Sequence, residues 1–248
     1  MAHFRDLKRS IRALLAGDDW SIRISELDGV PAGQLPGPLF SLLLDRDELV
    51  RWRAVEAFGR AVARMAESTL AGEGLERARV VLRQCLWRLN EESGGLGWGI
   101  PEALGETLAR HERLAGEFHR MLASYVRVET RGEGNYLEHV PMRRAVFWAL
   151  GRLAQSFPQL LRAEIPSLLA GLAEEDATNR GLCAWTLGQV CAGQGGPEEV
   201  QAALRLHVDE ADTFLLFTLG ALLCPTVGEA ARSALEGIAP QARGISEI

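Results

Sequence analysis

The sequence has few of the features that mark secreted, membrane or metal-binding proteins. Its four cysteines lie far apart with no C-x-x-C pair, which indicates reduced, mostly buried thiols rather than disulfides or a zinc site. The longest apolar run, residues 213–224, spans about 12 residues, whereas a membrane-spanning helix needs roughly 20. No apolar stretch of signal-peptide length follows the first residues. We therefore expect a cytoplasmic protein without a membrane segment.

An excess of basic residues is also missing. The chain has 27 basic and 33 acidic residues, a net charge of -6, and only one lysine, Lys8. Nucleic-acid-binding domains usually carry a basic balance, so the composition argues against a general nucleic-acid binder. The fractions of 47% hydrophobic and 24% charged residues exclude an intrinsically disordered chain. The 248 residues are compatible with one folded domain.

Five segments share a short pattern that ends in glycine. Taking each glycine as position zero, apolar residues recur at positions -9, -5, -4, -1 and +3, which is one face of an α-helix. None of these segments shows the two-residue period of a strand. The successive spacings between the glycines are 46, 46, 37 and 32 residues. The five glycines are Gly59, Gly105, Gly151, Gly188 and Gly220.

A second apolar segment precedes each of these predicted helices, so that the repeating unit is a helical hairpin. The preceding segments are residues 38–44, 78–89, 118–128, 165–172 and 200–206. We predict an all-α, right-handed α-solenoid of about five hairpins. Residues 1–248 would form a single domain with an N-terminal capping helix over 1–16, repeats over 36–236 and a frayed tail over 239–248.

The stretch 44–59, LDRDELVRWRAVEAFG, resembles a HEAT repeat of the bacterial HEAT-like type that is also found in phycobilisome lyases. The resemblance covers residues 36–236 and implies an armadillo/HEAT-like superhelix. It also implies a ladder between an Asp in each turn and an Arg at the start of each second helix. Asp47 with Arg51 and Asp176 with Arg180 match this pattern, whereas the second and fifth repeats depart from it.

Some HEAT-like proteins are enzymes, and the iron-dependent deoxyhypusine hydroxylases carry His-Glu pairs at the start of their second helices. None of the equivalent dipeptides here can bind a metal, and the five histidines have no ligand spacing. We therefore expect no metal and no cofactor, and histidines at the surface or at helix caps. The equivalent dipeptides are 52–53, 98–99, 144–145, 181–182 and 213–214.

A glycine-rich loop over residues 93–99 leads into the second repeat helix, whose free N–H groups would suit an anion. Neither a preceding strand nor a following Gly-Lys-Ser/Thr supports a phosphate loop, and the neighbouring Glu91, Glu92 and Glu102 would repel phosphate. We interpret the loop as structural, allowing repeats two and three to pack closely.

The helix face opposite the apolar stripe is unusually aromatic. At positions -7, -3 and +1 it carries four of the six tryptophans, although a purely structural protein would favour Glu, Lys or Gln there. Because the resemblance implies that second helices line the concave surface, these residues predict a binding groove. The alternative is that the rings fill gaps between neighbouring helices. The candidate binding residues are Trp52, Trp98, Trp148, Trp185, Phe217, Arg144, Arg152 and Glu102. We predict that the other two tryptophans, Trp20 and Trp87, belong to the core.

The favoured function is a non-catalytic scaffold that binds a protein or peptide partner in the concave groove. A HEAT-like enzyme or a pigment-attachment factor using the same groove is the alternative. A nucleic-acid binder of the HEAT-like DNA-glycosylase kind is disfavoured, since Glu56, Glu102 and Glu106 lie in the stripe.

Overall fold

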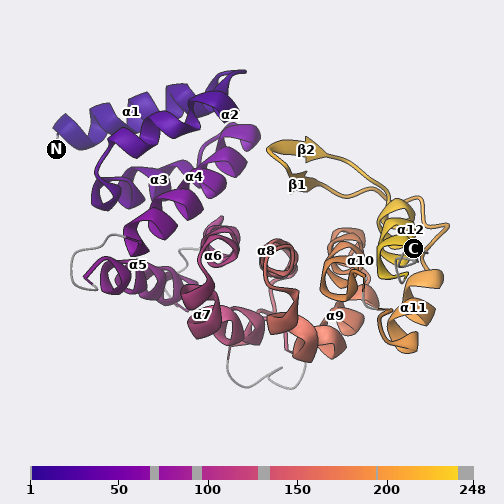
Figure 1. The fold of residues 1–248 in the computed structure, drawn as a ribbon. Helices are drawn as coiled ribbons and strands as arrows, with labels where there is room; N and C mark the ends of the chain where they lie inside the picture. The colour runs from indigo at the N-terminus through magenta and orange to yellow at the C-terminus, as the bar shows by residue number, and fades with distance from the viewer. Residues whose placement is uncertain (1, 68–72, 91–96, 128–134, 194, 240–248) are drawn as a thin grey trace, which may run out of the picture.

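The computed structural model describes residues 2–67, 73–90, 97–127, 135–193 and 195–239. These residues form a curved stack of helical hairpins, with one row of helices inside the curve and a second row outside it (Figure 1). The inner row is α4 (Glu48–Ala66), α6 (Ile100–Arg110), α8 (Val140–Ala154), α10 (Ala177–Cys191) and α12 (Val227–Ile238). The outer row is α3 (Pro36–Leu42), α5 (Glu73–Leu89), α7 (Glu112–Ser124), α9 (Ile165–Leu172) and α11 (Glu198–Arg205). The predicted α-solenoid of about five hairpins is confirmed.

The remaining helical elements lie mostly at the N-terminal end. α1 (Ala2–Ala16) packs on α3 and α4, and α2 (Trp20–Arg23), η1 (Ile24–Gly29) and η2 (Ala32–Gln34) connect it to the first hairpin. A further 3-10 segment, η4 (Pro158–Glu164), precedes α9. The predicted tail from residue 240 onward lies outside the described residues.

Local sequence signals set the beginnings of the inner helices. The Asp47 carboxylate accepts hydrogen bonds from the backbone N–H groups of Leu49 and Val50 at the start of α4, and the Asp176 carboxylate accepts one from the backbone N–H of Asn179 at the start of α10. α6 and α8 carry proline in their first turn, where no helical N–H is required. At the start of α12, Thr226 and Glu229 form a reciprocal capping box.

Four of the repeat glycines lie where neighbouring inner helices touch. A Cβ atom on Gly59 would lie 2.5 Å from Glu106 Cγ, and one on Gly105 would lie 2.5 Å from Ala149 Cα. The same atom on Gly151 would meet the Trp185 ring, and on Gly188 it would lie 2.9 Å from Ala234 Cα. The prediction that Gly59, Gly105 and Gly151 mark close helix crossings is confirmed.

The fifth copy of the pattern does not form a helix, so this part of the prediction was wrong. Residues Leu216–Thr218 (β1) and Ala221–Leu223 (β2) pair as an antiparallel hairpin, with Phe217 opposite Leu222. Leu219 and Gly220 have φ angles of 50° and 77°, the left-handed pair that a tight hairpin turn requires. A short apolar run fits a strand or a helix equally well, and here the turn decided the outcome. The place of the fifth inner helix is taken by α12.

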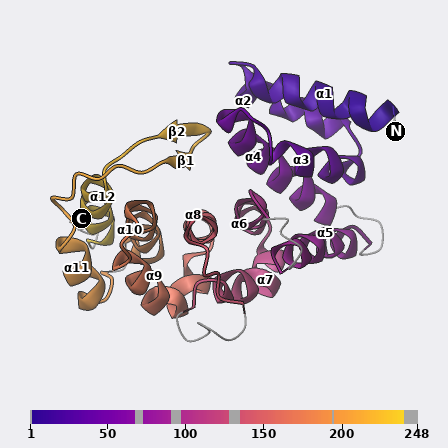
Figure 2. The same cartoon turned by 180° about the vertical axis from the view of Figure 1, so that it is seen from behind.

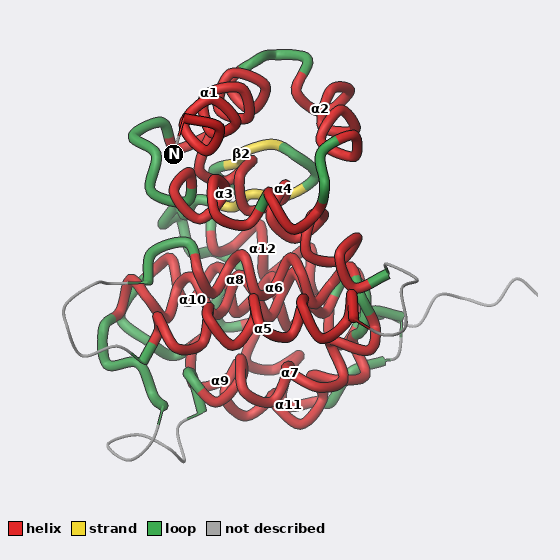
Figure 3. The backbone as a smooth tube through the Cα atoms, turned by 90° about the vertical axis from the view of Figure 1, so that its left-hand side faces the viewer, coloured by secondary structure: helices red, strands yellow, loops and turns green. Residues whose placement is uncertain are grey.

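The hairpin lies across the concave side of the stack, and its tip points toward α2 and α4 (Figures 1 and 3). A Cβ atom at Gly220 would lie 3.0 Å from Trp20 Cζ2, so the tip touches the N-terminal end of the solenoid. The hairpin thus spans the curve from its C-terminal end to its N-terminal end. Its position decides which of the predicted groove residues remain accessible.

Candidate functional site

The inner helices line the concave side of the stack, and the β1–β2 hairpin lies over part of it (Figure 2). Trp148 on α8 is only 2% exposed and Phe217 on β1 only 4%. Trp148 Nε1 donates a hydrogen bond of 2.8 Å to the Phe217 carbonyl oxygen, which satisfies the buried indole. The Trp52 ring packs on both, with centroid distances of 4.8 Å to Trp148 and 5.3 Å to Phe217. For Trp148 and Phe217 the packing alternative therefore holds.

Arg152 and Trp185 also have structural partners. Arg152 Nε lies 2.6 Å from Glu106 Oε2, and the same buried carboxylate accepts from Arg110 Nε at 2.5 Å. Burial and the nearby Glu106 raise the pKa of Glu56, which completes this charge network behind the hairpin. Trp185 is half-buried and covers Gly151. The structure does not bring these two residues together with Trp98, as the groove hypothesis had expected.

Five of the predicted residues line one surface beside the hairpin, namely Trp52, Trp98, Glu102, Arg144 and the buried Trp148. Two pockets, of about 420 Å³ and about 230 Å³, share Trp52, Trp98 and Glu102, and we call them together the tryptophan groove. The larger pocket lies against the turn between α3 and α4, and the smaller extends over Arg144. Trp98 is 41% exposed, and its ring meets His139 edge to face at 5.7 Å.

Glu102 is the unusual residue of the tryptophan groove. Its Oε2 atom is buried and has no hydrogen-bond partner among the described residues. Burial raises the pKa of its carboxyl to about 7, although a hydrogen bond from the Glu102 backbone N–H and, to a smaller extent, the charge of Arg51 act in the opposite direction. A buried carboxylate oxygen without a hydrogen-bond partner lowers the free energy of unfolding. Such atoms are rare in folded proteins, so Glu102 is a candidate for a role in binding.

The other charged side chains that line the tryptophan groove all have partners. Arg51 pairs with Glu48 at 3.1 Å and donates to the Asp45 carbonyl oxygen at 3.0 Å. Asp45 in turn accepts from Arg12 at 2.7 Å, and Arg144 Nε donates to Asp176 at 3.0 Å. Among the described residues that line this surface, Glu102 is therefore the one ionisable side chain without an ion-pair partner.

Similarity to known proteins is limited to the fold. The family model of the HEAT-like repeat matches residues 140–190, which span α8, η4, α9 and α10. A designed armadillo repeat protein aligns over 94% of both chains with 17% identity and a TM-score of 0.50. The chain therefore contains a HEAT-like repeat at residues 140–190 and has the α-solenoid fold of armadillo repeat proteins. Designed armadillo repeat proteins for modular peptide recognition also align, over 94% of this chain and 93% of theirs, with 18% identity and a TM-score of 0.46. No curated protein matches in sequence.

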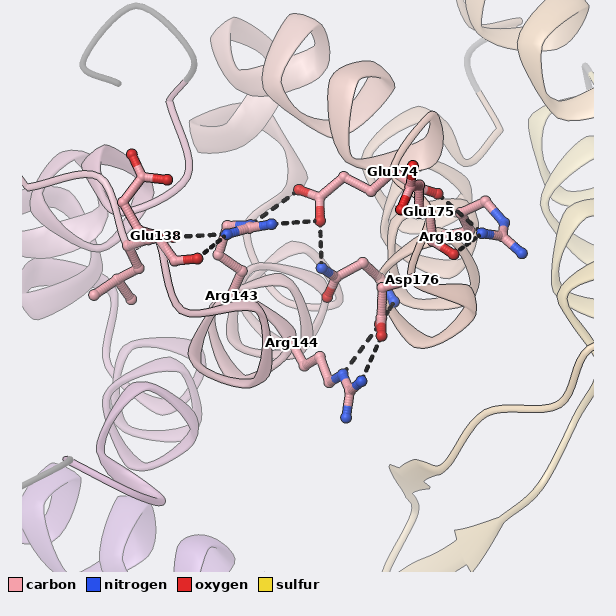
Figure 4. A network of polar contacts seen from close by, with 9 residues as sticks. Glu138, Arg143, Arg144, Glu174, Glu175, Asp176 and Arg180 are labelled. Atoms are coloured by element: carbon pink, nitrogen blue, oxygen red, sulfur yellow. Dashed lines mark hydrogen bonds and ion pairs between the residues drawn. The ribbon is translucent and has the colours of Figure 1, made fainter. Parts of the chain in front are cut away.

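In the α8 and α10 repeats the ion pairs connect successive turns, whereas Arg180 also donates to backbone carbonyl groups of its own turn (Figure 4). The predicted pairs of Asp47 with Arg51 and of Asp176 with Arg180 do not form; Arg51 pairs with Glu48 instead. Arg144 at the start of α8 pairs with Asp176 before α10, and Arg180 at the start of α10 pairs with Glu210 and Asp212 in the next turn. Arg143 is buried, donates to both carboxylate oxygens of Glu174 and also donates to two backbone carbonyl groups. The ladder therefore holds neighbouring repeats in register.

The histidines and cysteines of the described residues have mainly structural surroundings. Among the residues that the structure describes, no group of three or more His, Cys, Asp or Glu side chains could hold a metal ion. Three of the four cysteines are buried, and burial raises the pKa of Cys85 to about 12. Two histidines have the expected local roles, since His111 caps α7 and His207 lies 2.8 Å from Glu210. No described helix has the length and apolar character to cross a membrane.

Other predictions met mixed outcomes. Trp20 is buried as expected, whereas Trp87 on the outer helix α5 is 64% exposed, so its assignment to the core was wrong. Residues 93–96 of the glycine-rich loop lie outside the described residues, while Gly99 begins α6 with φ of 76°. A Cβ atom there would lie 2.9 Å from Leu43 Cβ, so this end of the loop packs against the first repeat rather than the third.

Proposed function

We propose that this α-solenoid protein is a non-catalytic scaffold whose tryptophan groove binds a segment of a partner polypeptide. The observation that supports this most directly is the exposure of Trp98 on a concave surface where the other aromatic residues of the stripe are half-buried or buried. Tryptophan contributes large contact area and a polar N–H, and it is enriched where binding energy concentrates. An exposed ring beside two pockets is a ready anchor point.

The shape of the groove favours an extended chain as ligand. The two pockets lie on either side of the shared residues, so one side chain of the ligand could fill each of them. The walls come from four successive inner helices, α4, α6, α8 and α10, and from Leu215, which immediately precedes β1. Because the ion-pair ladder and the glycine contacts fix these helices, the surface is organised before the ligand arrives, which lowers the entropic cost of binding.

The proposal is tested by selecting ligands from a random-peptide display library and measuring their affinity for Trp98→Ala and Trp87→Ala proteins. Both substitutions remove an exposed tryptophan, but Trp87 lies on the outer helix α5. We expect Trp98→Ala to weaken binding by at least tenfold and Trp87→Ala to leave it unchanged. Peptides that bind both variants as well as the parent protein would overturn the proposal, as would a library that yields no ligand.

A further inference from the structure

The charged residues of the tryptophan groove indicate which kind of ligand side chain can bind there. Every charged residue along it is paired except Glu102, whose Oε2 has no donor among the described residues. A neutral apolar ligand would leave that oxygen unsatisfied, and an anionic ligand would add repulsion. A ligand with a positively charged donor removes this imbalance, because it brings the opposite charge to the carboxylate.

The aromatic residues point to the same ligand. Trp52 and Trp98 line both pockets together with Glu102. Indole rings attract cations through the negative potential of their faces, and tryptophan does so more strongly than the other aromatic residues. Two tryptophans and a carboxylate therefore offer an ammonium group aromatic contact and a counter-charge. The alkyl stem of a lysine side chain can lie along the rings while its head reaches the carboxylate.

We infer that the tryptophan groove binds a lysine side chain of the partner polypeptide, with its ammonium group between Trp52, Trp98 and Glu102. This assignment rests on the proposed function and adds the chemical class of the ligand. Lysine is favoured over arginine because Oε2 of Glu102 is buried, so that a ligand in the groove can reach only Oε1, which suits a compact ammonium donor. A guanidinium group reaches its full strength only when it binds both oxygens of a carboxylate.

The test uses fluorescein-labelled (Lys-Ser)4 and matched peptides in which norleucine or arginine replaces every lysine, with affinity measured by fluorescence anisotropy. Norleucine keeps the alkyl stem and removes the charge. We expect the norleucine peptide to bind at least tenfold more weakly than the lysine peptide, and the arginine peptide to fall between them. Equal affinity for the lysine and norleucine peptides, or no detectable binding of the lysine peptide, would overturn the inference. This comparison uses the parent protein alone, so a folding defect of a variant cannot affect it.

Two protein variants then assign the effect to Glu102. Glu102→Gln should weaken lysine-peptide binding by about tenfold, whereas Glu198→Gln, which changes the net charge equally at an exposed site on α11, should have no effect. Thermal unfolding of both variants checks that they are folded. An equal loss for both would show general attraction to an acidic protein and contradict the inference. A different outcome would overturn this inference while the proposed function stands. It would be found if the selected library peptides contain no lysine, bind Trp98→Ala more weakly than the parent, and bind Glu102→Gln as tightly as the parent.

Discussion

The contact between Gly105 and α8 offers a sharp test of how the solenoid packs. A Cβ atom at position 105 would lie 2.5 Å from Ala149 Cα and 2.7 Å from the Ala149 carbonyl oxygen. These are backbone atoms, which cannot rotate away, so Gly105→Ala can be accommodated only if α6 and α8 move apart. We place the cost at the upper end of the usual overpacking range, about 3 kcal/mol.

The same substitution also has a favourable effect, because alanine is a better helix former than glycine by about 0.5 to 1 kcal/mol. The net destabilisation of Gly105→Ala is then about 2 kcal/mol. In a chain of this size that corresponds to a fall of about 4 to 8 °C in Tm. Gly116→Ala is the matched control, since Gly116 lies within α7 and no atom lies within 4 Å of its added Cβ.

Thermal unfolding followed by circular dichroism measures both variants against the parent. We expect Gly116→Ala to melt slightly higher than the parent and Gly105→Ala clearly lower. If Gly105→Ala melts at or above the parent temperature, the close approach of the inner helices is not what requires glycine in the repeat pattern.

Three further predictions concern charge and the hairpin. Arg143→Ala should destabilise the protein by about 3 to 5 kcal/mol, because it leaves Glu174 without its buried partner. Arg144→Ala should cost at most about 1 kcal/mol, because the Arg144 side chain is 40% exposed in its pair with Asp176. Urea unfolding of both variants measures the two free energies of unfolding. The folded-state pKa of Glu102, about 7, lies above its unfolded value, so its contribution to stability is full below pH 4.5 or so and is lost as the pH rises through 7. Glu102→Gln should remove this loss from the pH profile of Tm, although Arg51, Arg144 and His139 border the same groove; an unchanged profile would contradict the assignment. Leu219→Asn should raise Tm by a few degrees, because Leu219 is 99% exposed with a φ of 50°, a conformation that asparagine adopts more readily; a lower Tm would mean that the turn is not strained.

The repeat architecture could be predicted from the sequence because its signals are local and recur. Glycines at a 46-residue spacing, with an apolar helical face around them, placed α4, α6 and α8 at once. The fifth inner helix was missed because Leu219-Gly220 completes the same pattern while serving as a hairpin turn. The capping box of Thr226 and Glu229 was the signal for α12, and its apolar face carries small alanines that the pattern did not weigh.

The candidate site could be predicted only in part. Helical spacing put Trp52, Glu102 and Arg144 on one side of the inner helices, whereas Trp98, which was predicted within the helix, lies in the turn before α6 and still lines the same pocket. Spacing gives no information about a covering segment from elsewhere in the chain, so the burial of Trp148 beneath Phe217 could not be foreseen. Likewise, the importance of Glu102 depends on which neighbouring charges are already paired, and those partners come from other repeats, as in the pair of Arg12 with Asp45.

The most direct test of the binding account is to observe the six tryptophan indole N–H signals by NMR while (Lys-Ser)4 is added to the ¹⁵N-labelled protein. Single Trp→Phe substitutions assign the signals. The account predicts saturable shifts for Trp98 and Trp52, with the signals of Trp87 on the outer face and of buried Trp20 unchanged. Shifts centred on Trp87, or no shift of Trp98 at any peptide concentration, would contradict binding in the tryptophan groove.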